Sequence, residues 1–245
     1  HALTAKATDA AGNISAASTS FSVVVDQTDP TPALDTVAAS NVINTAAKAE
    51  GVTLTGTRAT NDRVVLTFGA GASAVQVLPE TDGTGWSYTL TAADYAALGE
   101  GTAQSVTVTS VDLAGNEAEL SRDLTIITSP LAAPEVPDEA AGNTSKTEPT
   151  LSVALPTSDA SERLPVVGDT LVLVDENNNV LATKSLAADD LQGTVDLTIT
   201  PALVDGVYAI GARLIDAYGN ERDSDTALTY TVDTSAPGAP KVPTL

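Results

Sequence analysis

The residues of this chain that could do chemistry are almost all oxygen donors. The sequence has 32 Asp and Glu residues against 11 Lys and Arg, no Cys, and a single His, which is residue 1. A Ser-His-Asp triad or a histidine base therefore has no internal histidine to use, and a zinc site of Cys and His lacks its ligands. Carboxylate and amide oxygens are instead the ligands that Ca²⁺ prefers. The formal net charge of −21 also disfavours binding to nucleic acid.

The most regularly spaced of these donors belong to a motif that occurs three times. Asp-x-x-Gly-Asn begins at Asp9, Asp112 and Asp216. Alternating apolar residues and a proline-bearing segment follow each copy. A repeat of about 100 residues has the length of a whole domain. The proline-bearing segments therefore predict four parts, with a truncated domain's C-terminal hairpin first, two full domains, and a linker with the start of a further domain: residues 1–25, 26–128, 129–232 and 233–245.

The elements that must position these motifs are predicted to be β-strands. Short stretches with alternating apolar and polar residues are typical of half-buried strands. The predicted strands are residues 52–57, 64–68, 74–78, 86–90, 151–155, 170–175, 180–185 and 195–200. The Gly-Asn pair of each motif, and residues 176–179, predict hairpin turns. Six to eight short strands per domain indicate an all-β fold, a β-sandwich with Greek-key connections.

Two further segments have specific predictions. Residues 91–98 begin with Thr91, which is followed three residues later by Asp94, and predict a short helix. Trp86 could offer a face to a sugar, but it alternates with Tyr88 and Leu90 on one strand, which favours a place in the core. No apolar segment reaches the roughly 18–20 residues that a membrane helix needs.

The sequence resembles tandem immunoglobulin-like repeats of giant secreted bacterial adhesins, of the repeats-in-toxin and biofilm-associated class. The similarity is carried by the three Asp-x-x-Gly-Asn motifs, by Val24-Val25-Asp26 and Thr231-Val232-Asp233 with proline beyond, and by residues 41–57 and 148–152. The resemblance implies tandem immunoglobulin-like sandwiches in long arrays that act as a stalk at the extracellular bacterial surface. It also implies calcium between neighbouring repeats of the same chain. Asn41 and Ala47 stand where that class often has acids, so the loop around them lacks two carboxylates that a calcium site would use. Enzymatic activity is disfavoured separately, by the composition.

The first candidate calcium site combines the motif of one domain with the linker that precedes it. In a sandwich of this topology, the last hairpin lies at the end where the linker arrives. We therefore expect Asp112 and Asn116 to approach Asp26 and Asp29, and a Ca²⁺ ion would relieve the repulsion between their carboxylates. The alternative is that Asp112 only caps its own turn by accepting backbone hydrogen bonds.

The second candidate site is poorer in acids. Ser129 stands where the other linkers have Asp26 and Asp233, although Asp216 is present and Asp138 lies further along. We therefore expect this position to be the weaker calcium site of the two.

The function predicted from these features is that of an extender, or stalk, that projects a distal ligand-binding domain, with calcium stiffening its joints. Two alternatives remain open: one domain could bind a glycan or a surface protein directly, or the chain could be an accessory module of a secreted enzyme.

Overall fold

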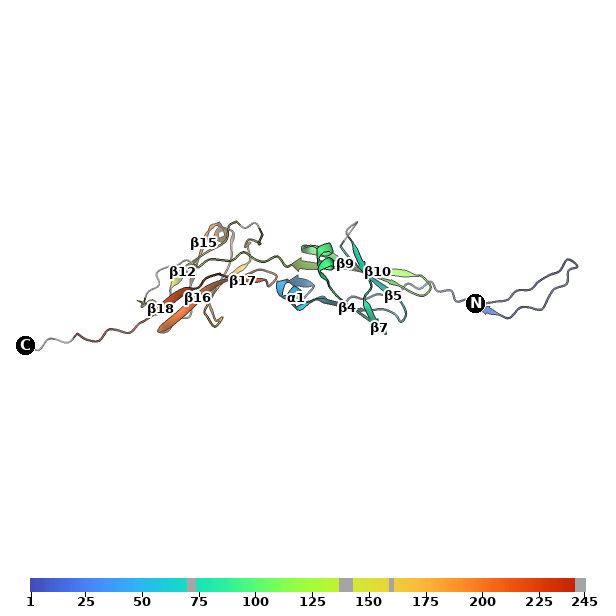
Figure 1. The fold of residues 1–245 in the computed structure, drawn as a ribbon, viewed down its shortest axis with the longest axis horizontal. Coiled ribbons are helices and arrows are strands. Elements are labelled where there is room, and N and C mark those ends of the chain that lie inside the picture. The colour runs from blue at the N-terminus through green and yellow to red at the C-terminus, as the bar shows by residue number, and fades with distance from the viewer. Residues whose placement is uncertain (70–73, 137–142, 159–160, 241–245) are drawn as a thin grey trace, which may run out of the picture. The chain divides into compact units, whose positions relative to one another are not determined.

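The computed structural model describes residues 1–69, 74–136, 143–158 and 161–240, and the chain divides into two compact units (Figure 1). Unit 1 contains residues 1–42 and 51–126, and unit 2 contains residues 43–50 and those from 127 onward. The predicted all-β fold is confirmed, because both units consist of short strands arranged in facing sheets. Apolar side chains that alternate along these strands form the cores.

Unit 1 is built from a five-stranded and a three-stranded sheet, although residues 43, 44 and 127 of the five-stranded sheet are counted with unit 2. The first has the order β3 (Val42–Asn44), β10 (Glu117–Ile127), β9 (Gly101–Val111), β5 (Arg63–Phe68) and β6 (Val75–Val77). The second has the order β4 (Thr53–Thr57), β8 (Gly85–Thr89) and β7 (Glu80–Asp82). Leu54 from the second sheet and Leu66 and Phe68 from the first are fully buried, so the core lies between the sheets. Trp86 is 3% exposed, which confirms its predicted place in the core.

Unit 2 repeats this arrangement. One sheet has the order β11 (Asn143–Thr144), β18 (Leu228–Val232), β16 (Gly206–Ile215), β13 (Thr170–Val174) and β14 (Val180–Ser185), and β17 (Glu221–Asp223) also pairs with β16. The other contains β12 (Thr150–Ala154) and β15 (Thr194–Thr198). Leu171, Leu173 and Leu214 belong to one buried apolar cluster with Val153 and Leu197 from the other sheet.

The order of strands in both large sheets gives the predicted Greek-key topology. The long hairpin β9–β10 lies next to β5, although β6, β7 and β8 come between them in the sequence. In unit 2 the last two long strands, β16 and β18, lie next to β13 in the same way. Each Asp-x-x-Gly-Asn motif of a full domain therefore follows the strand at the centre of its large sheet.

The predicted helix is present as α2 (Ala92–Leu98), and Thr91 and Asp94 form its capping box. Two helical segments were not predicted from the sequence. Residues 45–50 form α1 (Thr45–Glu50), because Asn44 Oδ1 accepts a hydrogen bond from Ala47 N and helix-forming residues follow. Residues 188–192 form the 3₁₀ helix η2 (Ala188–Gln192).

The first 25 residues form a hairpin with the short strands β1 (Ala2–Leu3) and β2 (Phe21–Ser22). Leu3 and Phe21 are 56% and 69% exposed. Their counterparts in the sequence repeat, such as Val106 and Leu124 in unit 1, are fully buried. The hairpin thus presents to solvent the face that both sandwiches bury.

Candidate functional site

The Asp-x-x-Gly-Asn motif forms a loop in which the aspartate caps its own turn. Asp112 Oδ1 accepts hydrogen bonds from Ala114 N and Asn116 N, both at 2.8 Å, and Oδ2 accepts one from Asn116 Nδ2 at 2.7 Å. Gly115 has a φ of 93°, which favours glycine at that position. These are the contacts of the capping role, which was the alternative to calcium binding.

Within the residues that the structure describes, the same loop occurs four times rather than three. Residues 9–13, 112–116 and 216–220 share these contacts, and residues 175–179 repeat them with Asn178 at a φ of 61° in place of the glycine. Asn tolerates this left-handed conformation better than most residues. The Asp, the terminal Asn and the positive φ are therefore what the loop requires, and a search for Asp-x-x-Gly-Asn alone misses Asp175.

Hydrogen bonding keeps these carboxylates charged. The side-chain amide of Asn116 is the main cause that lowers the pKa of Asp112, and the backbone N–H groups of the loop lower it further against a smaller effect of burial. The pKa of Asp9 and that of Asp175 are lowered in the same way by Asn13 and Asn179. The loops consequently carry a negative charge wherever ordinary carboxylic acids are ionised.

In both full domains the terminal Asn also binds the chain that leads into the sandwich. We call residues 26–29 and 127–129 the incoming segments. Asn116 Nδ2 donates to Asp26 O at 3.3 Å, and Asn220 Nδ2 donates to Ile127 O at 3.0 Å. In the part of the chain that the structure describes, Asn179 Nδ2 makes only the bond to Asp175. The amide thus links loop and incoming segment in units 1 and 2.

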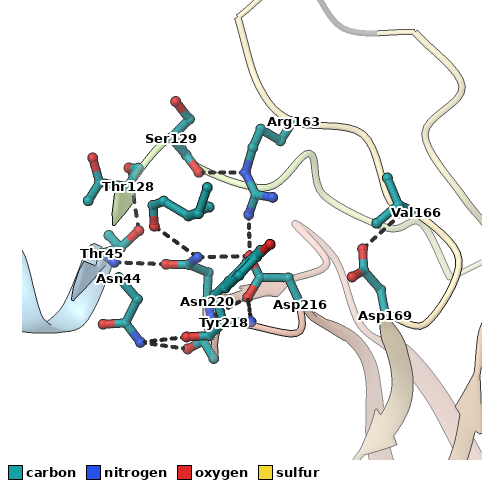
Figure 2. Close-up of polar contacts among 12 residues, drawn as sticks. Asn44, Thr45, Thr128, Ser129, Arg163, Val166, Asp169, Asp216, Tyr218 and Asn220 are labelled. Carbon is teal, nitrogen blue, oxygen red and sulfur yellow. Dashed lines mark hydrogen bonds and ion pairs between the residues drawn. The ribbon is translucent and has the colours of Figure 1, made fainter. Parts of the chain in front are cut away.

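The second of these loops has additional partners from the segment before and within α1. Asn220 Oδ1 accepts a hydrogen bond from Thr45 N at 2.8 Å, and Asn44 Nδ2 donates to Tyr218 O at 3.1 Å (Figure 2). Lys48 Nζ donates to Thr128 Oγ1 at 3.1 Å. Residues 43–50 therefore pack on both the loop and the incoming segment of unit 2.

Two buried carboxylates and one guanidinium lie beside this loop. Asp216 is 6% exposed and pairs with the Arg163 guanidinium, while Asp169 is 1% exposed and accepts a bond from Val166 N at 2.9 Å (Figure 2). Burial alone would raise the pKa of Asp216, but hydrogen bonds from Asn220, Arg163 and Tyr218 lower it overall. Burial raises the pKa of Asp169, and the negative charge of Asp216 raises it further.

The structure brings together some of the predicted calcium ligands. Asp26 meets the Asp112–Asn116 loop through its backbone carbonyl, and its carboxylate accepts a bond from Thr28 N at 3.0 Å. Asp29 is exposed, next to the buried Pro30. Asp138 lies outside the described residues. Across residues 1–69, 74–136, 143–158 and 161–240, no three acidic or histidine side chains converge as they would around a metal ion.

A groove in unit 2 has a volume of about 510 Å³. Its described lining residues include Glu135, Glu162 and Arg222 and contain no aromatic side chain. Pockets for small molecules are lined mainly by apolar and aromatic groups. The groove therefore lends no support to a stacked sugar. Separately, none of the helices in the described part of the chain is long and apolar enough to cross a membrane.

Comparisons with known proteins give structural neighbours only. No protein-family model and no curated protein sequence matches the chain. One similar structure belongs to a study of host cell surface retention of a 1.5-MDa bacterial ice-binding adhesin, with 21% identity, 94% of this chain and 73% of that chain covered, and a TM-score of 0.40. A second is a Ca²⁺-stabilized adhesin of an Antarctic bacterium that binds ice, with 24% identity, coverage of 96% and 57%, and a TM-score of 0.41.

A third is a tetra-tandem repeat in the extending region of a large adhesion protein, with 25% identity, coverage of 94% and 56%, and a TM-score of 0.30. The chain thus spans little more than half of the second and third structures. The structures to which this chain is similar include repeat domains of giant bacterial adhesins, the class that its sequence resembles.

Proposed function

We propose that this chain is a non-enzymatic extender segment of a bacterial cell-surface adhesin that projects a distal ligand-binding domain. The observation that carries the proposal is the contact between each terminal Asn and the incoming segment, Asn116 with Asp26 O and Asn220 with Ile127 O. An extender must resist bending where one domain joins the next. A side chain that fixes the incoming backbone to its own sandwich serves that purpose and requires no binding pocket.

Residues 43–50 belong to unit 2, whereas the residues on both sides of them belong to unit 1. The domains in this proposal remain those of the sequence repeat, residues 26–128 and 129–232, flanked by 1–25 and 233–245.

We further propose that calcium stiffens the incoming segment of unit 1, at Asp26, Asp29, Asp112 and Asn116. Among the described residues, the ion pairs involve none of these three carboxylates. Asp112 accepts three hydrogen bonds, which leaves one of the roughly four lone-pair positions of a carboxylate open. The backbone carbonyl of Asp26 and the carboxylates of Asp26 and Asp29 would add oxygens of the type that calcium prefers.

Calorimetric melting of the chain with calcium and with a chelator tests this proposal. Extracellular sites of this type bind with a Kd of ~10⁻⁴–10⁻³ M. Calcium at about ten times the Kd would stabilise the folded state by about 1.4 kcal/mol. For a domain of this size we expect the melting temperature of unit 1 to rise by roughly 5–10 °C.

Asp112→Asn should abolish that rise, because it removes a ligand charge. Asp189→Asn is the matched control, since it removes an exposed carboxylate from η2 and should keep the rise. The calcium proposal fails if wild-type protein melts at the same temperature in millimolar calcium and in chelator, or if both variants respond alike.

A further inference from the structure

The Asp216 loop differs from the Asp112 loop by one donor. Asp216 Oδ1 accepts from Tyr218 N and Asn220 N, both at 2.8 Å, and Oδ2 accepts from Asn220 Nδ2 at 2.8 Å. These three bonds match those of Asp112. The fourth donor is the Arg163 guanidinium, which pairs with Oδ2 (Figure 2). Because a carboxylate offers about four lone-pair positions, Asp216 is saturated where Asp112 retains one position.

We infer that Arg163 takes the place of a bound cation at this loop, so that unit 2 holds its incoming segment without calcium. The inference rests on the proposal that calcium serves the equivalent loop of unit 1. The residues around Asp216 do not fit a calcium ion, because a guanidinium already occupies the position that the ion would take. A second positive charge at this point would be repelled by Arg163.

Arg163 also connects the loop to the incoming segment, as a shared cation would. Its Nε donates to Ser129 O at 3.3 Å, while its guanidinium binds Asp216. Its backbone is fixed as well, because Arg163 N donates to Pro130 O at 2.8 Å and Ala132 N donates to Arg163 O at 2.9 Å. The Arg163 backbone is therefore hydrogen-bonded to residues just after the incoming segment. From there its guanidinium extends to the Asp216 carboxylate.

The sequence difference between the linkers agrees with this role. Ser129 stands at the repeat position of Asp26 and Asp233. A calcium ion gains from a linker carboxylate, whereas a guanidinium is a donor and is satisfied by the backbone carbonyl of Ser129. Asp169 adds a second buried negative charge beside Arg163, so removal of the guanidinium would leave two carboxylates without a cation.

Amide hydrogen exchange of the full chain, with calcium and with a chelator, tests the inference at both loops at once. In wild-type protein we expect residues 216–220 to exchange at the same rate in both conditions. In Arg163→Gln the same residues should exchange at least about tenfold faster without calcium, because a buried carboxylate loses its charged partner. Arg163→Lys should give a smaller increase, since it keeps the charge but loses the planar fork.

Lys184→Gln is the matched control. It removes the cation of another ion pair in unit 2, between Lys184 and Asp190, and should leave residues 216–220 unchanged. Slower exchange of wild-type residues 216–220 on addition of calcium would overturn the inference. Equal exchange in Arg163→Gln and Lys184→Gln would also overturn it. A lack of calcium response at residues 112–116 would instead count against the calcium proposal for unit 1 and leave the role of Arg163 standing.

Discussion

The aspartate and the terminal asparagine of the repeated motif have different structural roles. The aspartate builds the loop by accepting bonds from the loop's own backbone, as Asp112 and Asp175 both do. The terminal asparagine connects that loop to the incoming segment in both sandwiches, as Asn116 and Asn220 do. An amide suits this position because it donates and accepts at once, and Asn220 uses both functions.

The two buried aspartates of unit 2 predict opposite responses to pH. The pKa of Asp216 in the folded state is lowered, so its contribution to stability is complete above the ordinary carboxylic acid range and is lost as the pH falls through the lowered pKa. The pKa of Asp169 is raised, so its contribution is complete below that range and is lost as the pH rises through the raised pKa.

Urea unfolding at pH 7 and near pH 3 of two variants measures this contrast. At pH 7, Asp216→Asn should lower the free energy of unfolding by about 2 kcal/mol, because a charged acceptor of four donors is lost. Asp169→Asn should leave that free energy unchanged or raise it, since it removes a poorly compensated buried charge. Near pH 3 the cost of Asp216→Asn should shrink. Equal losses in both variants at pH 7 would contradict the pKa directions.

At the scale of the elements, the strands and α2 were predictable because their signals are local. The alternation along residues 64–68 appears as β5, and the Thr91–Asp94 pair caps α2 as expected. The contacts of α1 could not be predicted from the local sequence. Asn44 and Thr45 form hydrogen bonds with the loop of residues 216–220, which is far away in the sequence.

The candidate site was predictable in part for the same reason. The spacing of Asp112 and Asn116, and the approach of Asn116 to Asp26, follow from the repeat and the sandwich topology. The pairing of Arg163 with Asp216 does not, because nothing in the repeat marks residue 163. Its place depends on the parallel bridge between Leu131 and Arg163, which are far apart in the sequence.

The contact between β4 and β8 gives a prediction at the element scale. A Cβ atom at Gly56 would lie 2.0 Å from Ala33 O and 2.4 Å from a ring carbon of Trp86. Backbone and a buried indole cannot both move aside, so Gly56→Ala should lower the free energy of unfolding by more than about 2 kcal/mol. Gly85→Ala is the control on β8, where the nearest atom is 3.4 Å away. Chemical denaturation compares the two, and similar stabilities would show that Trp86 is not tightly packed.

At the scale of the whole molecule, only some of the acidic residues behind the net charge of −21 have a structural role. Asp9, Asp112, Asp175 and Asp216 build loops, Asp94 caps α2, and Asp169 is buried in unit 2. The chain contains no Cys, so no disulfide contributes to its rigidity. In the proposed extender, rigidity comes from the sandwich cores and from the side chains that hold the incoming segments.

Small-angle X-ray scattering tests the central claim, that the terminal asparagines stiffen the extender by holding the incoming segments. The proteins to compare are wild type, the double variant Asn116→Ala/Asn220→Ala, and Asn179→Ala, which loses the same loop contact but no incoming segment. We expect the double variant to show a broader distribution of interatomic distances than wild type, in calcium and in chelator, because each lost hydrogen bond weakens the attachment by about 1 kcal/mol. Asn179→Ala should superimpose on wild type. Identical scattering from the double variant and wild type would contradict the account.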